Sequence, residues 1–274
     1  MNTTQRYKAV ARHYNGGPFD YEMVRLDEYG FIEGEITRRY LSRLVRRESA
    51  VADIGAGVGH YAEFLAGRGC RITLVDISRR LLEAARDRLG KAGLSGQIDR
   101  AILSSATDLR EIGSRSVDVV LCLGPFYHLW TIAERRKAVS EAHRILKPNG
   151  ILFASAINRM AYLRDAVQNG SKYIRDPKWA RQLGALLKKG TLLSGDLSYS
   201  YFTDPIDFLG LFERNFRTIG LVGSEAFAIS AQSSVARLKR GQRCRWLDLV
   251  EKAGRTSAGL WFSDHFLYMG MKKK

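Results

Sequence analysis

The chain has few cysteines and lacks a long apolar run. Cys70, Cys122 and Cys244 lie far apart and form no C-x-x-C pair, which argues against a disulfide framework and against a structural zinc site. No stretch reaches the roughly 18 consecutive apolar residues of a membrane span, and the polar first residues do not resemble a secretory signal. The sequence therefore predicts a cytoplasmic protein with no bound metal and no membrane partner.

Prolines are also scarce, and the five present are scattered along the 274 residues. No Pro-rich linker, internal repeat or low-complexity tract divides the chain. A hydrophobic content of 45% is enough for one α/β domain with a sizeable core. We therefore expect a single continuous domain.

Acidic residues are outnumbered, because 28 Asp and Glu face 44 Lys and Arg and leave a formal net charge of +16. Such an excess favours an anionic partner, so nucleic acid is kept as an alternative. The basic residues are spread along the chain, however, and the aromatic-basic motifs of common RNA-binding modules are absent. Solvated surface arginines are the preferred interpretation.

Apolar runs typical of buried strands alternate with helical patterns through the middle of the chain. The expected strands cover residues 50–54, 71–75, 97–103, 117–123 and 150–156. The expected helices cover residues 61–66, 81–92 and 132–146, and a later one covers 205–212. This order predicts a Rossmann-like α/β fold, with a mostly parallel sheet, helices on both faces and a ligand at the carboxyl ends of the strands.

A glycine-rich turn follows the first predicted strand. Asp53 precedes three glycines in alternating positions, Gly55, Gly57 and Gly59. These glycines allow a tight turn and close approach of a ligand to the backbone. The next strand ends at Asp76, whose carboxylate can accept both ribose hydroxyls of a nucleotide. His60 stands where a dinucleotide fingerprint needs its third glycine, so the pattern is G-x-G-x-G.

The pattern Asp53-x-Gly55-x-Gly57-x-Gly59, with Asp76 one strand later, resembles the first motifs of the class I S-adenosylmethionine (SAM)-dependent methyltransferases. The resemblance implies SAM as the cofactor and a seven-stranded sheet, completed by an antiparallel hairpin of residues 217–222 and 265–271. It implies that the glycine loop, which includes Ala56, approaches the methionine part of SAM. Asp53 would neutralise the ammonium group, and Ile77 would lie against adenine.

The third expected strand leads into a weaker match. Most methyltransferases of this class have a Gly-Asp-Ala-x-Asp-Leu pattern there, whose first acid accepts the adenine amino group. The chain has Ser104-Ser105-Ala106-Thr107-Asp108-Leu109, so Ser105 offers only a hydroxyl. We still assign Ser105 and Ala106 to the cofactor site, and we expect Asp108 to cap a short helix.

The fourth strand leads into Leu123-Gly124-Pro125-Phe126-Tyr127-His128-Leu129. This run is similar to the Leu-Gly-Pro-x-Tyr-His-Leu block of a bacterial small-molecule subgroup of these enzymes. Leu123 and Gly124 would then lie near the methyl group, and Tyr127 and His128 at the acceptor site. The His128 imidazole can accept the proton of the acceptor; a hydrogen bond to the cofactor or the lid is the alternative. The other histidines, including His265, are expected to be structural.

Residues 1–48 are expected to form a helical cap. The segments 14–20 and 32–39 look like this subgroup too, which opens with a mobile Tyr-containing cap and a Glu-x-Glu-x-Thr helix. Tyr14 would face the sulfonium in a cation–π contact, and Arg25 would bind the substrate. Ordinary packing of the aromatic residues is the alternative.

Residues 157–203 are too long for an ordinary connection after a strand. Their amphipathic stretches predict helices that cover the strand ends as a lid between the core, 49–156, and the rest of the sheet, 204–274. Basic residues of this segment, such as Arg159 and Lys172, outnumber acids such as Asp196. Arg159 is therefore a candidate for binding an acceptor with carboxylate or phosphate, although a solvated helix face is the commoner reason for such charges.

The sequence thus predicts a SAM-dependent methyltransferase that transfers a methyl group to a small molecule by in-line displacement, with His128 or Tyr127 assisting deprotonation. The alternatives are an RNA methyltransferase and an enzyme that uses SAM without transferring the methyl group. The acceptor and the oligomeric state stay open, because a fold does not determine a substrate.

Overall fold

The structure is a computed structural model that describes residues 2–17, 19–168, 175–192 and 200–273. A central sheet contains the strands β1 (Ala50–Ile54), β2 (Arg71–Asp76), β3 (Ile98–Leu103), β4 (Val117–Cys122), β5 (Leu146–Ile157), β8 (Phe216–Gly223) and β9 (His265–Lys272). These seven strands lie in the order β3-β2-β1-β4-β5-β9-β8. Only β9 runs antiparallel to its neighbours β5 and β8. This topology confirms the Rossmann-like, mostly parallel sheet expected from the sequence.

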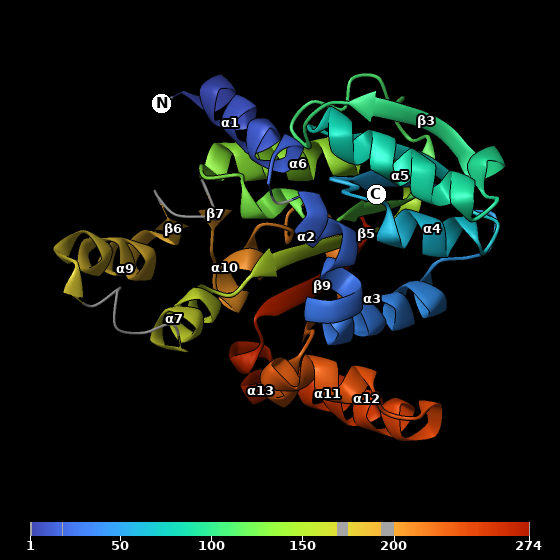
Figure 1. Cartoon of the computed structure of the whole chain (residues 1–274). Coiled ribbons are helices and arrows are strands. Elements are labelled where there is room, and N and C mark those ends of the chain that lie inside the picture. The colour runs from blue at the N-terminus through green and yellow to red at the C-terminus, as the bar shows by residue number, and fades with distance from the viewer. Residues whose placement is uncertain (1, 18, 169–174, 193–199, 274) are drawn as a thin grey trace.

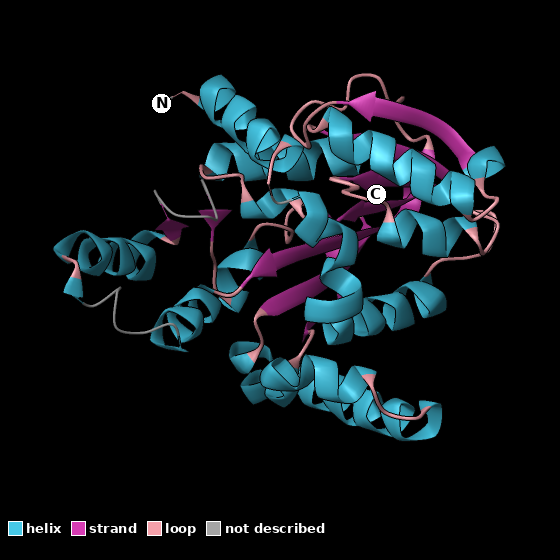
Figure 2. Cartoon of the chain, viewed as in Figure 1, coloured by secondary structure: helices cyan, strands magenta, loops and turns pink. Residues whose placement is uncertain are grey.

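Helices cover both faces of the sheet (Figure 2). The first group is α1 (Thr3–Asn15), α2 (Phe19–Val24), the π-helical turn η1 (Arg25–Tyr29), α3 (Phe31–Leu44), α4 (His60–Ala66) and α5 (Arg79–Lys91). The middle group is η2 (Ser95–Gln97), η3 (Pro125–Tyr127), α6 (Ile132–Ile145), α7 (Arg159–Gln168), α9 (Pro177–Lys189) and α10 (Pro205–Gly210). The last group is η4 (Ala226–Ala231), α11 (Gln232–Ala236), α12 (Arg240–Gly254) and α13 (Ser257–Phe262). None of the described helices combines the length and apolar character that crossing a bilayer requires.

The central strands β1, β2 and β4 are buried on both faces of the sheet, and their successive side chains point to opposite sides. In β1, Val51 belongs to a core shared with α3, α4 and α5. Ala52 and Ile54 belong to a second core, shared with α6 and α10. Burial on both faces explains why the strands appear in the sequence as continuous apolar runs.

Capping residues determine where several helices begin. The Ser78 hydroxyl accepts the Leu81 N–H at 3.2 Å at the start of α5. Thr131 and Glu134 form a reciprocal capping box at the start of α6. Asp204 precedes a proline and accepts a backbone N–H at the start of α10. These local signals place the loops that join the strand ends to the helices.

Strand β5 begins earlier than expected. Helix α6 ends at Ile145, and β5 starts at Leu146 instead of residue 150. Pairing with β4 shifts register between Leu146 and Ile151. Asn149 has a φ of 62°, in the left-handed region. The Pro-Asn-Gly turn therefore lies inside the strand as an irregularity. The sequence pattern had predicted that this turn connects helix α6 to the start of the strand.

The last two strands are not joined by a tight hairpin. They pair in the expected antiparallel way, but residues 224–264 between them contain η4, α11, α12 and α13. The sequence interpretation assigned no helix to this stretch. In α12, Trp246 and Leu249 are exposed while Leu247 and Val250 are buried, so apolar residues on both faces obscure the helical period. The helix predicted over 205–212 ends earlier, at Gly210.

Residues 157–203 contain α7, α9 and a two-stranded sheet of β6 (Thr191–Leu192) and β7 (Ser200–Tyr201), where helices alone were expected. Residues 169–174 and 193–199, which include Lys172 and Asp196, lie outside the described residues. Buried side chains from α7, α9 and the residue after β7 form a small core of their own, Tyr162, Ala166, Leu186 and Phe202. Figure 1 shows α9 beyond α7, extending away from the sheet.

Two glycines of α12 test how this helix packs. A Cβ on Gly254 would lie 2.1 Å from the Gly223 carbonyl oxygen, whereas a Cβ on Gly241 would meet nothing within 4 Å. We expect Gly254→Ala to lower the free energy of unfolding by about 1–3 kcal/mol through overpacking. Gly241→Ala should leave it unchanged or raise it by up to about 1 kcal/mol, because alanine favours helix. Urea unfolding followed by circular dichroism measures both, and equal effects would contradict this packing.

Candidate functional site

The loop between β1 and α4 contains three glycines with left-handed backbone. Their φ angles are 70° at Gly55, 55° at Gly57 and 83° at Gly59. A Cβ on Gly55 would lie 2.7 Å from the Pro125 ring, and one on Gly59 would lie 3.0 Å from the Cβ of Ala85. Gly57 has no neighbour within 4 Å of such a Cβ. Packing therefore requires two of the glycines, and the third leaves its backbone open to a ligand.

Asp76 binds this loop from the end of β2. One carboxylate oxygen accepts the Gly57 N–H at 3.0 Å, and the other accepts the Ser78 N–H at 2.8 Å. Burial raises the pKa of Asp76, and the hydrogen bonds from backbone N–H groups oppose that shift. The carboxylate is thus held in one orientation beside the open backbone of Gly57.

Two further residues predicted to bind the cofactor, Ala56 and Ile77, lie near Asp76. The Ala56 N–H donates to the Val75 carbonyl at 3.0 Å, and the Gly55 N–H donates to the same oxygen at 2.7 Å. Ile77 follows Asp76 and is half-buried. The glycine loop is therefore tied by backbone hydrogen bonds to the end of the neighbouring strand, where a ribose site was expected.

Asp53 lies near the end of β1 and is 3% exposed. Among the described residues none donates a hydrogen bond to its carboxylate, and its Oδ2 atom is fully buried. Burial and the nearby Asp76 charge raise the pKa of Asp53 to about 7. A buried carboxylate without a donor, beside an open glycine backbone, fits a cationic group of a ligand.

The loop after β3 carries a short chain of hydroxyl groups. Ser105 Oγ lies 2.8 Å from Thr107 Oγ1, which lies 3.3 Å from the Tyr7 hydroxyl of α1. Ala106 between them is buried. The serine that replaces the expected acid is thus in contact with the N-terminal helix. No helix follows Asp108, whose carboxylate instead accepts the Arg110 side chain at 2.7 Å, so its predicted capping role is wrong.

The loop after β4 places Tyr127 against Ser155 of the neighbouring strand β5. Ser155 donates its hydroxyl to the Leu123 carbonyl at 2.7 Å, so its oxygen accepts the Tyr127 hydroxyl proton, also at 2.7 Å. Burial raises the pKa of Tyr127 well above its ordinary value. Gly124 begins the turn η3, and its carbonyl accepts the Tyr127 N–H. Tyr127 is therefore a neutral phenol in a fixed orientation.

The end of α1 reaches two strand ends at once. The Tyr14 hydroxyl lies 3.0 Å from His128 Nε2, with the rings edge to face and their centroids 5.5 Å apart. The next residue, Asn15, accepts the Ser78 hydroxyl at 2.6 Å. Burial raises the pKa of Tyr14, so this phenol is also neutral. The N-terminal helix thus covers the loops that follow β2 and β4.

Arg25 is engaged in ion pairs. Its Nη1 donates to Glu33 Oε2 at 2.7 Å, and its Nε lies 3.6 Å from Glu22 Oε2. Burial opposes the charged form, but Glu33 and Glu22 outweigh it and raise the pKa of Arg25 well above its ordinary value. Arg25 therefore joins η1 to α2 and α3 within the cap.

The structure brings together three ionisable residues that sequence reasoning missed, the buried Glu33 and Glu225 and the partly buried His265. His265 Nδ1 lies 2.7 Å from Glu225 Oε1 and 3.8 Å from Glu33 Oε2, and the His265 N–H donates to Glu225 Oε2 at 3.0 Å. The His265 ring centroid lies 6.2 Å from that of Tyr127. Although burial opposes it, the two carboxylates raise the pKa of His265 to about 9. The three residues are far apart in the sequence, and only the position of Glu33 in the Glu-x-Glu-x-Thr helix could have drawn attention to them.

The donor atoms of Glu33, Glu225 and His265 lie within 4.8 Å of one another, close enough to hold a metal ion. Charge balance argues otherwise. Arg25 already bonds to Glu33, and a protonated His265 neutralises the second carboxylate. A divalent cation would have to displace a proton and approach a guanidinium group. The group fits a self-neutralised ion network better than a metal centre.

Arg159 makes its contacts within the outer segment. Its Nη1 donates to the Leu187 carbonyl at 3.0 Å, and its Nη2 lies 3.8 Å from Asp204 Oδ2. It therefore links α7 to α9 and to the start of α10. These contacts do not join Arg159 to Tyr127 or His128, and its role in binding a substrate stays a prediction.

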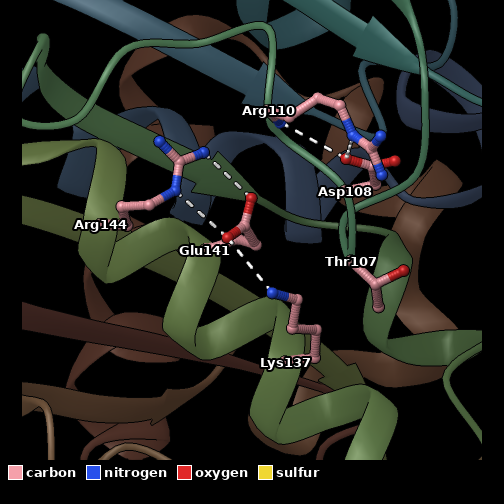
Figure 3. A pocket seen from close by; sticks show the side chains of 6 residues that line it. All are labelled: Thr107, Asp108, Arg110, Lys137, Glu141 and Arg144. Atoms are coloured by element: carbon pink, nitrogen blue, oxygen red, sulfur yellow. Dashed lines mark hydrogen bonds and ion pairs between the residues drawn. The ribbon is translucent and has the colours of Figure 1, made fainter.

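A surface hollow lies between the loop after β3 and helix α6 (Figure 3). It is lined by Thr107, Asp108, Arg110, Lys137, Glu141 and Arg144. Arg144 and Glu141 are 3.0 Å apart and Arg110 and Asp108 are 2.7 Å apart, so the charges satisfy one another. The hollow contains neither the open glycine backbone nor the carboxylate without a donor, and we do not assign the site there.

Residues 52–154 match the family model Methyltransf_11, described as a methyltransferase domain. The matched residues run from β1 into β5 and include the glycine loop, Asp76 and the loop after β4. The part of the chain that is similar to this family is therefore the core that carries these three loops.

Among curated proteins the chain is similar to ubiquinone biosynthesis O-methyltransferases. That of Thiobacillus denitrificans is 34% identical over 126 residues, 45% of this chain and 51% of the relative. That of Pseudomonas syringae pv. tomato is 33% identical over 126 residues, with the same shares of each chain. The chain thus spans about half the length of the curated relatives it matches.

Solved structures show the same fold over most of the chain. A SAM-dependent methyltransferase from Thermotoga maritima gives a TM-score of 0.59 at 17% identity, covering 96% of this chain and 99% of the other. Geranyl diphosphate C-methyltransferase from Streptomyces coelicolor gives 0.54 at 14% identity, covering 87% of this chain and 76% of the other. At these identities the likeness shows the fold alone.

Asp53 makes stability depend on pH. Its pKa is about 7 in the folded chain against an ordinary 3.8, so the folded state holds an extra proton between these values. The associated stabilisation is complete below the ordinary pKa and is lost as pH rises through 7. We expect the free energy of unfolding of Asp53→Asn, minus that of the wild type, to grow by about 1–3 kcal/mol from pH 5 to pH 8. Urea unfolding at several pH values measures this difference.

The surface variant Asp108→Asn is the matched control, because its carboxylate is exposed and paired with Arg110. It should show no such trend from pH 5 to pH 8. Parallel curves for wild type and Asp53→Asn would contradict the raised pKa of Asp53.

Proposed function

We propose that this chain is a SAM-dependent methyltransferase that acts on a small molecule. One observation carries the proposal: the open backbone of Gly57 is bonded to the buried carboxylate of Asp76, and a second buried carboxylate, Asp53, lies close to Asp76 on the adjacent strand. The match of residues 52–154 to a methyltransferase domain supports the same conclusion. The fold shared with solved methyltransferases is consistent with it.

The described residues fit SAM. The donor-free Oδ2 atom of Asp53 suits the ammonium of the methionine part, which would replace the missing hydrogen bond. Asp76, already oriented by two N–H groups, suits the ribose hydroxyls. Ile77 and Ala106 provide apolar surface for adenine, and Ser105 a hydroxyl. When bound, SAM supplies a methyl group activated by the positive sulfur.

The N-terminal cap would hold the cofactor and exclude water. Tyr14 and Asn15 contact the loops after β4 and β2, so helix α1 spans both ends of the site. The neutral ring of Tyr14 suits a position facing a sulfonium, since aromatic faces attract cations. The lid role of residues 157–203 and substrate binding by Arg25 and Arg159 remain parts of this proposal.

We assign to His128 the role of the general base, which takes the proton from the methyl acceptor. Tyr127 stays protonated and donates a hydrogen bond to Ser155. It therefore shapes the acceptor site and does not act as a base. His265 has a pKa of about 9 and is protonated at neutral pH, so it cannot accept a proton there. Its charge is already balanced by Glu225 and Glu33, so we assign it to the ion network beside Tyr127 and not to proton transfer.

We favour a hydroxyl oxygen as the acceptor atom. The curated relatives are named O-methyltransferases, and an imidazole base suits the deprotonation of a phenol. Membership of the subgroup with the Leu-Gly-Pro-x-Tyr-His-Leu block, a cytoplasmic location and an anionic acceptor stay predictions from the sequence. An RNA acceptor would rest on the net charge alone, and no contact within the site favours it.

The cofactor assignment is tested by Asp76→Ala. Loss of its carboxylate removes the ribose partner and frees the Gly57 N–H, so we expect SAM affinity to fall at least about tenfold, as for a charge-assisted hydrogen bond. Isothermal titration calorimetry measures it. Asp108→Ala, which removes the exposed acid near the next strand end, should bind like the wild type. Unchanged affinity in Asp76→Ala would remove the proposal.

The proton assignment is tested with a phenol that bears a carboxylate as acceptor, by the release of S-adenosylhomocysteine. We expect His128→Asn to lower the rate about 100-fold at neutral pH, the usual contribution of a general base, with SAM affinity unchanged. The loss should shrink at high pH, where the hydroxyl ionises by itself. Tyr127→Phe should keep the rate within a few-fold; a larger loss there than in His128→Asn would overturn the assignment.

A further inference from the structure

Helix α12 presents a partly apolar stripe to solvent in the C-terminal helical layer, at the bottom of Figure 1. Gln242, Arg245, Trp246 and Leu249 stand at positions i, i+3, i+4 and i+7 of the helix, so they share a face. With Leu238 they line a hollow on the surface. Trp246 is 46% exposed and Leu249 is 49% exposed. This stripe does not contribute to the sheet cores.

The stripe continues onto η4. Phe227 is 51% exposed, and its ring centroid lies 6.3 Å from that of Trp246. The opposite face of α12 supplies Leu247 and Val250 to the core shared with α3. Folding therefore accounts for one face of the helix only. Single exposed apolar residues are ordinary, but contiguous ones on a helix mark a surface that contacts something else.

The same layer is strongly basic. Residues 226–262 contain seven Lys and Arg against two acids, Asp248 and Glu251. Both acids are neutralised, because Asp248 lies 2.5 Å from Arg39 and Glu251 lies 2.5 Å from Arg43. In the described part of the chain, no carboxylate comes within ion-pair distance of four exposed cations around the stripe, Arg237, Lys239, Arg240 and Arg245.

We propose that this surface, defined as Phe227, Leu238, Arg245, Trp246 and Leu249 and called the α12 face, docks on an anionic lipid bilayer. The helix would lie in the plane of the headgroups, with the apolar side chains in the outer acyl region and Arg245 at the phosphates. Tryptophan and arginine suit this boundary, because each combines an apolar body with a polar group.

A bilayer explains both properties of the α12 face. A second copy of the chain would cover the apolar side chains but would place the same unpaired cations against one another. Nucleic acid would neutralise the cations but would leave Leu238 and Leu249 without an apolar partner. The sequence predicted no membrane partner because it lacks a spanning segment, and a helix lying on the surface needs none.

The experiment uses the full chain and sedimentation with phosphatidylcholine vesicles, with and without phosphatidylglycerol. We expect binding only to the anionic vesicles, weakened by salt, with a blue shift of tryptophan fluorescence. The double variant Trp246→Ala/Leu249→Ala and the variant Arg245→Glu should each bind at least about tenfold more weakly. Circular dichroism and SAM calorimetry should match the wild type in both, so the result does not depend on the proposed enzyme activity.

Matched controls come from elsewhere on the surface. Ile206, on α10, is 70% exposed, and the Arg110 side chain is 83% exposed. Ile206→Ala and Arg110→Glu should bind vesicles like the wild type. Absence of binding to anionic vesicles, or an equal loss in the control variants, would overturn the proposal. Two other results would also overturn it. One is a dimer of the wild type that the double variant dissociates, and the other is RNA binding that the double variant abolishes while no vesicle binding is seen.

Discussion

The carboxylate of Asp76 is the interaction on which the site depends. It accepts the Gly57 N–H from the loop after β1 and the Ser78 N–H from the start of α5. Ser78 in turn donates its hydroxyl to Asn15 of the N-terminal helix. One buried anion therefore positions two loops at the carboxyl end of the sheet and, through Ser78, the helix that covers them. The open Gly57 backbone keeps its left-handed conformation within this arrangement.

Buried charge near the site is handled in two ways. Glu33, Glu225, Arg25 and His265 neutralise one another, and the pKa of His265 rises accordingly. Asp53 has no such partner among the described residues and is left with a raised pKa. Desolvating an unpaired carboxylate costs stability, which a site can recover when a cationic ligand group binds. The two arrangements thus differ: one is a self-neutralised ion network, and the other is a buried carboxylate that suits the cationic ligand group proposed above.

Most of the sheet could be predicted from the sequence. The first strand begins and ends where expected, at Ala50 and Ile54, because strands buried on both faces appear as uninterrupted apolar runs. The C-terminal helices could not, because α12 exposes Trp246 and Leu249 beside the buried Leu247 and Val250, and this arrangement removes the periodic signal. The early start of β5 depends on pairing with β4 across a register shift, which no local pattern encodes.

The sequence by itself determined where the candidate site lies on the chain, because the glycines at 55, 57 and 59 and the acids at 53 and 76 are local signals with local physical causes. Only the tertiary structure decided which groups meet. In the folded chain Tyr14 contacts His128, and Ser155 contacts Tyr127. His265 lies against two carboxylates from distant elements. Such contacts depend on how strand ends and the N-terminal cap are brought together, and residues far apart in the chain leave no spacing from which that meeting could be inferred.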